Sequence, residues 1–283
     1  MSLPQFRSES TKVFRGNEQI RAFLYSDYTI KPHNHDFYEM NIVLRGNGTH
    51  KIEDASMSVR SGDVFVIPPN TVHSYCDTEN LDVYHVLFHQ DFIYENSHEG
   101  AHVPGFLQLI EIEPHLRQNF PGKMFLHLSP RKLQELETEL KFIEDNNELD
   151  NENMFLLKKH AALKILYWLS YLLYNQLHSE EKTTANKHEQ AILKALEYIH
   201  VNYGEKITID TLCKKVYLSR STFLRSFAQM CGEPPMEYLQ KYRCRKAEDM
   251  IKNTEFSKTE IAHLCGFYDL SHMERIINKE KDK

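Results

Sequence analysis

The C-terminal third of the chain repeats one pattern, and this repeat limits the available folds more than any other feature. In each copy, a short amphipathic segment is followed by a tight break and by a second helical segment that opens with a small polar residue. The first copy spans residues 208–227, and the second begins at Ser257 and continues past Asp269. Two short helices joined in this way form a helix-turn-helix, which can place its second helix in the major groove of DNA.

Cap residues support these predicted helices. Ser257 and Glu260 have the spacing of a capping box, in which both side chains bond free backbone N–H groups at the helix start. Ser219 and Asp269 are favourable N-caps for the second helix of each copy. A single copy would fit an ordinary helical bundle about as well, but two copies joined by the helical segment 238–251 favour DNA binding.

Residues from about 190 to 275 resemble the DNA-binding domain of the AraC/XylS family of bacterial transcription regulators. The residues that carry the resemblance are Leu212, Leu218, Ser219, Phe223, Leu224, Arg225, Ser226, Phe227, Gly232, Pro235, Tyr238, Leu239, Arg243, Ala247, Ile261, Ala262, Cys265, Gly266, Phe267, Asp269, Ser271 and Arg275. The resemblance implies an all-α domain with seven helices and two helix-turn-helix motifs, set in successive segments of the major groove on one face of promoter DNA.

The resemblance also implies which side chains face the bases. The matching positions are Ser221, Leu224 and Arg225 in the first recognition helix, and His272 and Arg275 in the second. Arg225 and Arg275 are the strongest candidates, because a guanidinium group can donate two hydrogen bonds to guanine. Further basic residues are predicted to contact phosphates, or else to lie on solvated helix faces: Lys214, Lys215, Arg220 and Lys241.

Two features depart from the family pattern. Tyr217 stands where the family often has glycine in the first turn, so we expect that turn to be reshaped. After Arg275 the sequence continues as a charged tail to Lys283 and ends where the family usually adds a final helix. We therefore expect the last helix to be missing, the core of the second motif to be depleted and its hold on DNA to be weaker.

Length and charge fit a sensor joined to a DNA-binding domain. A chain of 283 residues is long enough for two domains with separate cores. The net charge is −6, but residues 187–283 carry 17 lysines and arginines against 14 acidic residues, whereas residues 1–186 carry 17 against 26. The basic character therefore lies in the half predicted to bind DNA. The lack of a long apolar run argues against a membrane span, and five cysteines without a C-x-x-C pair indicate a reducing cytoplasm.

The first 128 residues are predicted to form a small antiparallel β-barrel. Short apolar runs at 38–44, 49–52, 64–67 and 84–88 are separated by glycine and proline, as in an all-β domain. Two polar motifs within these runs resemble those of the cupin superfamily, with Asn70 in a usual glycine position: His33-x-His35-x3-Glu39-x6-Gly46 and Gly62-x5-Pro68-x-Asn70-x2-His73.

The cupin resemblance implies a candidate metal site. In metal-binding cupins, the residues that match His33, His35, Glu39 and His73 hold a divalent ion. His33 and His35 are two residues apart, so they share one face of a strand. Three imidazoles and a carboxylate would suit Zn, Fe, Ni or Mn.

The alternative is that the same side chains bind a small-molecule effector, such as a sugar, without a metal. Tyr38 is then a further effector-binding residue next to His33, His35, Glu39 and His73. Other candidates for the wall of this pocket are Asn41, Tyr75, His85 and His89.

Residues 129–178 are predicted to be helical. Ser129 reads as an N-cap and Pro130 as the first helical residue. The following helix, roughly 153–177, is apolar on much of its circumference, which fits either a homodimer interface or packing against the barrel. Residues 178–187 lack an apolar anchor and are predicted to form a flexible linker.

The predicted fold class is therefore α+β, with a cupin-like effector-binding barrel at 1–128, a helical dimerisation or linker region at 129–178 and a double helix-turn-helix domain at 187–283. We expect a homodimeric transcription regulator, not an enzyme, which binds promoter DNA and a small-molecule effector and contacts RNA polymerase if it is an activator. One alternative is a dimerising modulatory protein with weakened DNA binding. A less favoured alternative is a metal-dependent cupin enzyme, which would need a bound metal with an open position.

Overall fold

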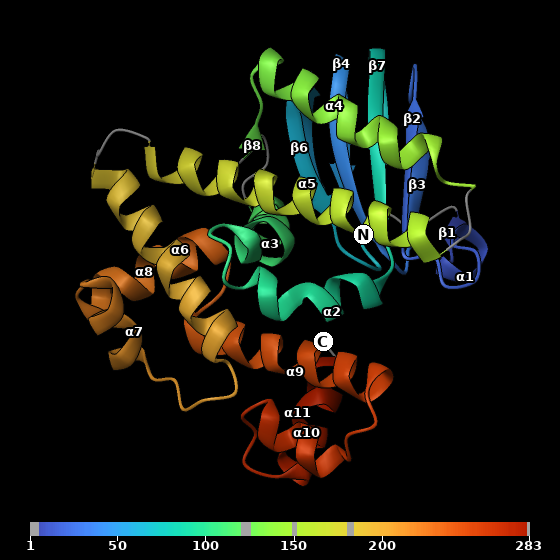
Figure 1. Cartoon of the computed structure of the whole chain (residues 1–283). Coiled ribbons are helices and arrows are strands. Elements are labelled where there is room, and N and C mark those ends of the chain that lie inside the picture. The colour runs from blue at the N-terminus through green and yellow to red at the C-terminus, as the bar shows by residue number, and fades with distance from the viewer. Residues whose placement is uncertain (1–5, 120–125, 149–151, 180–183, 282–283) are drawn as a thin grey trace. The chain divides into compact units, whose positions relative to one another are not determined.

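The computed structural model describes residues 6–119, 126–148, 152–179 and 184–281 (Figure 1). The chain divides into two compact units, residues 1–180 and 181–283. The first unit combines a sheet with helices and the second is helical, so the predicted α+β fold class is confirmed. None of the described helices is long and apolar enough to cross a membrane.

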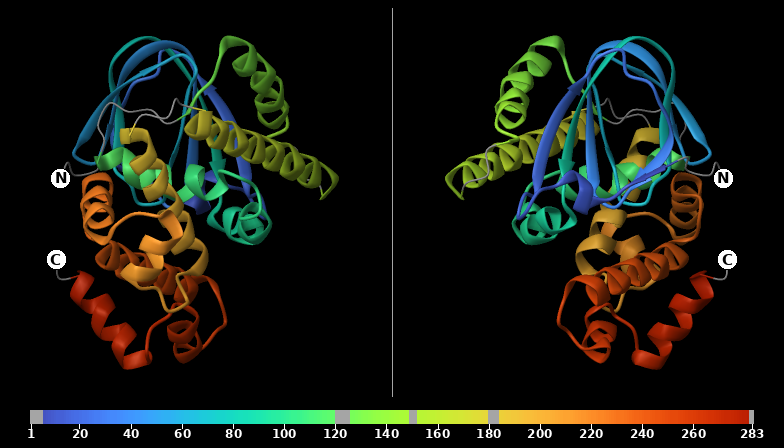
Figure 2. Two further views of the ribbon diagram at one scale, coloured as in Figure 1. Left: turned by 90° about the vertical axis from the view of Figure 1, so that its left-hand side faces the viewer. Right: turned by 90° about the vertical axis from the view of Figure 1, so that its right-hand side faces the viewer.

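Two long strands, β4 (Tyr38–Ile52) and β7 (His73–Phe88), organise the sheet of the first unit. They pair with each other in antiparallel fashion along most of their length, and register shifts between Val43 and Thr49 interrupt the ladder. Both strands curve with their partners (Figure 2). The remaining strands are β1 (Phe6–Ser8), β2 (Ile20–Tyr25), β3 (Ile30–His35), β5 (Ala55–Arg60), β6 (Asp63–Ile67) and β8 (Leu126–His127).

Each long strand changes partner along its length. The start of β7 pairs with β3, and its end pairs with β2. In the same way, β4 pairs first with β6 and then with β5. Strands β4, β5, β6 and β7 together form one apolar core, which consists of Val43, Ile52, Ala55, Met57, Val59, Phe65, Ile67, Tyr75, Leu81 and Val83.

Helices cover the sheet on the outside. Helix α4 (Pro130–Asp145) packs on β2 and on α5 (Glu152–Ser179), and α5 also reaches β2 and β8. The other helical segments of this unit are α1 (Ser10–Val13), α2 (Gln90–Gly100), the π-helix η1 (Gln108–Ile112) and α3 (Glu113–Asn119). Both η1 and α3 lie against β6.

Helix α5 uses its apolar circumference in two ways. One face is buried within the first unit and includes Ile165, Leu169 and Leu173. Leu157 and Tyr171 lie elsewhere on the helix and are each about half exposed, at 53% and 52%. The helix therefore packs inside its own unit and still presents apolar side chains to solvent.

The prediction of a flexible linker at 178–187 is wrong for the described part of that range. His178 lies in the last turn of α5, and residues 184–187 form the first turn of α6 (Thr184–Asn202). Both helices are anchored by apolar side chains farther along, and a helix extends at small cost once it is nucleated. Residues 180–183 lie outside the described part of the chain.

The second unit contains both predicted helix-turn-helix motifs. The first consists of α7 (Ile209–Val216) and α8 (Arg220–Cys231), and the second of α10 (Lys258–Leu264) and α11 (Leu270–Lys281). Helix α9 (Pro235–Asn253) joins them.

Separate apolar clusters support the two motifs. The first motif buries Leu212, Val216, Phe223 and Phe227. The second has a core of nine residues, namely Cys244, Ala247, Ile261, Ala262, Cys265, Phe267, Met273, Ile276 and Ile277. A hollow of about 420 Å³ opens beside Met273 and Ile277 of this second core. The expected weaker hold of this motif on DNA stays a prediction.

The caps predicted for the two helix-turn-helix motifs are present. The Ser257 side chain accepts from the N–H group of Glu260, and the Glu260 carboxylate accepts from the N–H group of Ser257 at 2.8 Å, which confirms the capping box. The Ser219 hydroxyl accepts from the N–H group of Thr222 at the start of α8. Asp269 also caps α11, because its carboxylate accepts from the N–H group of His272 at 2.7 Å.

The turn of each helix-turn-helix motif contains one residue with left-handed backbone, but the residue type differs between the two motifs. Gly266 has φ +74° in the second turn, and Tyr217 has φ +56° in the first. Left-handed backbone is free of strain for glycine but costs other residues roughly 1–2 kcal/mol. Tyr217 is also 93% exposed, so little packing offsets this strain.

We expect Tyr217→Gly to raise the free energy of unfolding by about 1 kcal/mol, because the release of left-handed strain exceeds the entropy that glycine adds to the unfolded chain. Urea denaturation of the whole chain measures the change. Tyr268→Gly is a matched control, since Tyr268 is also an exposed turn tyrosine, at 84%, but does not have positive φ. Equal effects of the two substitutions would contradict the strain argument.

Candidate functional site

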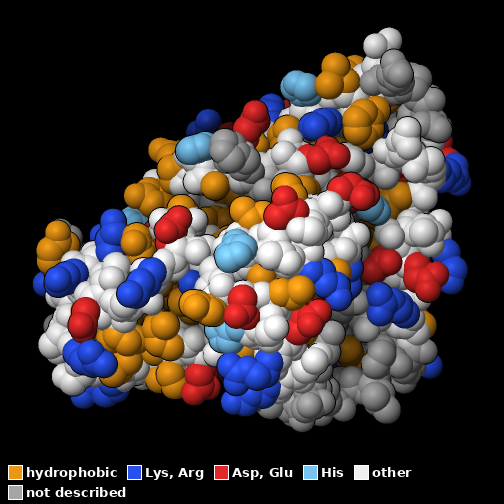
Figure 3. All heavy atoms as spheres, turned by 90° about the horizontal axis from the view of Figure 1, so that it is seen from below, with side chains coloured by type: hydrophobic (Ala, Val, Ile, Leu, Met, Phe, Trp, Pro, Cys, Tyr) orange, Lys and Arg blue, Asp and Glu red, His pale blue; other side chains and the backbone are white. Residues whose placement is uncertain are grey.

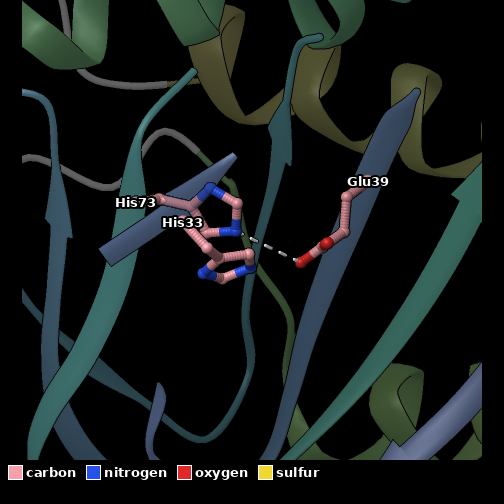
Figure 4. A group of neighbouring side chains, drawn as sticks. All are labelled: His33, Glu39 and His73. Atoms are coloured by element: carbon pink, nitrogen blue, oxygen red, sulfur yellow. Dashed lines mark ion pairs between the residues drawn. The ribbon is translucent and has the colours of Figure 1, made fainter. Parts of the chain in front are cut away.

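The predicted histidine motif forms a buried cluster inside the sheet of the first unit (Figure 4). His33 lies on β3 opposite His73 at the start of β7, and Glu39 lies near the start of β4. One ligand-type atom from each of these three residues lies within 4.8 Å of the other two. The alternation of β3 buries His35 on the same face as His33, as predicted.

The carboxylate of Glu39 is the centre of this cluster. It accepts hydrogen bonds from the side-chain amide of Asn41 at 2.9 Å and from Nδ1 of His85 at 2.8 Å. Nε2 of His35 lies 3.2 Å from the other carboxylate oxygen. Burial alone would raise the pKa of Glu39, but the neighbouring His85 and His35 more than offset it and hold this pKa well below its usual value. Glu39 is therefore an ionised carboxylate inside the barrel.

The histidines present their Nε2 atoms to this carboxylate. Nδ1 of His33, His35 and His73 each lies 2.7–3.1 Å from a backbone carbonyl two residues away. A carbonyl can only accept, so each Nδ1 carries the proton and, in a neutral ring, Nε2 keeps its lone pair. Burial lowers the pKa of His33, and it lowers that of His73 to about 3, so both rings are neutral at pH 7.

This donor set fits a cation. Within the described residues, Nε2 of His73 makes no hydrogen bond, although it lies 3.8 Å from an oxygen of Glu39. In the neutral ring this atom carries a lone pair, which an ionised carboxylate repels, whereas a divalent ion between the two would be attracted to both. The fixed Nδ1–H bonds also match the outer-shell bonds that orient metal-binding imidazoles.

Other predicted pocket residues divide into two groups. Asn41, Tyr75 and His85 are buried at the cluster or beside it. Tyr38 is half-buried at the first position of β4. By contrast, His89 lies at the N-cap of α2 and packs against Phe14, so its contacts are with that helix end and not with Glu39.

Sequence reasoning missed His50, which lies deeper in the sheet. Its ring stacks on Phe65 and packs against Tyr75, with ring centroids 4.7 Å apart in both cases. Burial is the main reason that its pKa lies well below the usual value, so the ring is neutral. The sequence contained a pattern that could have identified His50. Residues 49–52 were predicted to form a strand, and each side chain of a strand faces one side of the sheet.

Sequence reasoning also missed a buried pair on α3, Glu113 and Arg117. The guanidinium donates to the carbonyl of Val66 and lies 4.7 Å from the centre of the Phe65 ring. Burial raises the pKa of Glu113 to about 7 and lowers the pKa of Arg117. A glutamate and an arginine four residues apart are usually a solvated surface pair, so their spacing did not indicate that they are buried.

The second unit displays most of the predicted DNA contacts on its surface. Ser221 and Arg225 are exposed on one side of α8, Leu224 is half-buried beside them, and Arg275 is exposed on α11. Phe223 and Phe227 face the opposite way, into the core. The side chains therefore have the arrangement that a recognition helix requires.

Several other basic or polar candidates already have partners in the structure. Arg220 pairs with Asp210 at 3.0 Å, and Lys241 pairs with Glu233 at 2.6 Å. His272 packs against Phe267, and its Nδ1 accepts from the N–H group of Tyr268 at 3.4 Å. On the face of the molecule shown in Figure 3, basic side chains are interspersed with acidic ones.

Comparison with known proteins agrees with both parts of this arrangement. The AraC-like ligand binding domain matches residues 20–140, and a helix-turn-helix domain matches residues 212–282. The chain is thus a transcription regulator that joins a ligand-binding domain to a DNA-binding domain. It belongs to the AraC/XylS family of regulators, and the predicted family resemblance is confirmed.

The matches of this chain to relatives and to solved structures cover different lengths of the chain. The chain is 25% identical over 249 residues to the HTH-type transcriptional activator RhaS of Escherichia coli O139:H28, which covers 88% of this chain and 83% of the relative. The RhaS protein of Shigella boydii serotype 18 has the same identity and coverage. Among solved structures, the C-terminal domain of the response regulator yesN from Fusobacterium nucleatum is 26% identical, with 33% of this chain and 98% of that chain covered and a TM-score of 0.32. ToxT from Vibrio cholerae is 13% identical, with 92% of this chain and 94% of that chain covered and a TM-score of 0.34.

Glu113 should make stability depend on pH. Its pKa is raised from 4.5 to about 7 on folding, so the folded state binds more protons between these values, and the stability that this provides is lost as the pH rises through 7. Glu113→Gln removes that loss. We expect the free energy of unfolding of the variant, minus that of the wild type, to increase by roughly 3 kcal/mol between pH 5 and pH 8, as measured by urea denaturation. A stability difference that is constant over this range would contradict the prediction.

Proposed function

We propose that this regulator is an activator that binds promoter DNA in the cytoplasm as a homodimer and responds to a small molecule bound in its barrel. The observation that carries the proposal is the ring of buried, inward-facing imidazoles around ionised Glu39, in a chain that also carries two exposed recognition helices. The RhaS relatives are transcriptional activators, which supports the direction of control and a contact with RNA polymerase.

The effector would act by its difference in affinity between two states of the regulator. Binding can shift an equilibrium only by this differential affinity, so the effector has to fit one arrangement of the barrel better than another. The buried polar atoms around Glu39 are suited to binding and need no turnover. The proposed role is therefore sensing and not catalysis, in keeping with relatives that are regulators.

Arg225→Ala tests the DNA-binding role of α8. Removal of a bidentate contact to guanine should weaken binding by about 1–3 kcal/mol and relax the preference for one base pair. Gel-shift titration against the DNA upstream of the chain's own coding sequence measures both effects. Arg131→Ala on α4 is the control, because Arg131 is an exposed arginine of the other unit that pairs with Glu135. Unchanged binding by Arg225→Ala would remove this residue from base reading.

The same cluster is proposed to hold a divalent metal ion through His33, His35, Glu39 and His73. When bound, the ion would supply a Lewis acid that attracts hydroxyl or carbonyl oxygens of an effector. The chain itself orients the three imidazoles through their Nδ1–H bonds and supplies the negative charge of Glu39.

Metal analysis of the purified chain tests this site. We expect about one divalent ion per chain in the native protein and its loss when His33→Ala and His73→Ala are combined, since two of four ligands are then gone. His89→Ala should retain the ion, because His89 makes its contacts at the α2 N-cap. Native protein without stoichiometric metal would leave direct effector binding as the role of the cluster.

The exposed side of α5 is the proposed dimer contact. Leu157 and Tyr171 are four helical turns apart on similar sides of this helix and are about half exposed. We expect Leu157→Glu to raise the dimer dissociation constant about ten-fold or more, because a charge would be buried in the contact. Sedimentation analysis measures it, and Glu137→Gln, an exposed change on α4, is the control. A native chain that stays monomeric would contradict the proposal.

A further inference from the structure

A second set of buried polar groups lies beyond the cluster around Glu39. Arg117 is 0% exposed, His50 is 0% exposed and Tyr75 is 1% exposed. Across the described ranges, Nε and Nη1 of Arg117, both ring nitrogens of His50 and the hydroxyl of Tyr75 have no hydrogen-bond partner. Buried polar atoms are nearly always paired, so a set of this size indicates a partner other than the described residues.

Ring contacts place these groups along one part of the barrel. The guanidinium of Arg117 lies 4.7 Å from the centre of the Phe65 ring, which stacks on His50. His50 in turn packs against Tyr75, with ring centroids 4.7 Å apart. Phe65 and Tyr75 both belong to the apolar core between the strands, so these polar atoms border its interior.

Glu113 does not satisfy Arg117. The closest approach is 3.5 Å, between Nε of Arg117 and a carboxylate oxygen of Glu113, and neither oxygen of Glu113 accepts a hydrogen bond from any described residue. The pKa of Glu113 is about 7, so near neutral pH much of its negative charge is lost. Arg117 is left as a buried cation with weak compensation, which is costly in a protein interior.

The free groups share one chemical requirement. A guanidinium group has only donors, a tyrosine hydroxyl can donate, and a neutral imidazole donates from one nitrogen. Such a set needs an acceptor, and an anionic one also compensates Arg117. A planar carboxylate matches the fork of a guanidinium group and can accept two parallel hydrogen bonds from it.

We propose that the effector is a small hydroxy acid whose carboxylate is bound by Arg117, Tyr75 and His50 within the barrel. This inference rests on the proposed function, in which the effector occupies the barrel. The imidazoles around Glu39 would then contact the hydroxyl end of the molecule, and Arg117 would distinguish an acid from the corresponding neutral sugar or polyol.

Calorimetric titration of the full chain with matched probes tests the assignment. The pairs are glucuronate with glucose, gluconate with sorbitol, and lactate with propane-1,2-diol. We expect the acid of at least one pair to bind about ten-fold or more tightly than its neutral partner. A panel in which no acid binds, or in which neutral partners bind equally well, overturns the inference.

Two variants of the buried pair, Glu113 and Arg117, make the test more specific. Arg117→Met should abolish the preference for the acid, with the melting curve as a check on folding. Glu113→Gln should instead tighten the acid several-fold and leave the neutral partner unchanged, because Arg117 loses its competing carboxylate. A purely structural role for the pair would not produce this gain. Weaker or unchanged binding of the acid by Glu113→Gln overturns the inference even if Arg117→Met does not fold.

Additional controls distinguish binding of an effector from binding of any anion. They also distinguish failure of this inference from failure of the proposed function. Glu137→Gln, on the exposed side of α4, should bind all probes as the wild type does. Inorganic phosphate or acetate that binds as tightly as the hydroxy acids would overturn the assignment to an effector. Wild-type protein that binds promoter DNA but does not prefer acids refutes only this inference, whereas protein that ignores DNA refutes the proposed function.

Discussion

A carboxylate buried in a β-barrel has to be compensated, and this requirement organises the first unit. Glu39 is ionised although it is 5% exposed. Its compensation comes from three strands, because His35 lies on β3, Asn41 on β4 and His85 on β7. The antiparallel pairing of β4 with β7 places His85 opposite Asn41, two residues from Glu39. The pairing of the strands therefore positions the groups that stabilise the ionised form of Glu39.

The part of the site that follows from strand alternation could be predicted from the sequence. His33 and His35 had to share a face, and the two cupin-like motifs supplied Glu39 and His73. Arg117 could not be predicted, because its burial depends on how α3 packs against β6, a contact between segments distant in the sequence. Local patterns describe which side of an element is apolar, but not which polar side chain a later helix brings into the core.

In the DNA-binding unit, short-range chemistry determined most of what could be predicted. The capping box at Ser257 and the αL position of Gly266 need only neighbouring residues, and both are present. The linker prediction at 178–187 was wrong because it considered polarity and not the helices on either side. The orientation of His272 was likewise hidden, since its contact with Phe267 depends on the fold of the turn.

The ion pair between Arg220 and Asp210 has a consequence for the energetics of DNA binding. A phosphate that approached Arg220 would have to replace a carboxylate that already lies 3.0 Å away. The exchange of one anion for another contributes less than a newly formed contact, and it leaves Asp210 facing the negatively charged backbone. Affinity would accordingly fall with ionic strength less steeply than the number of basic side chains on this unit suggests.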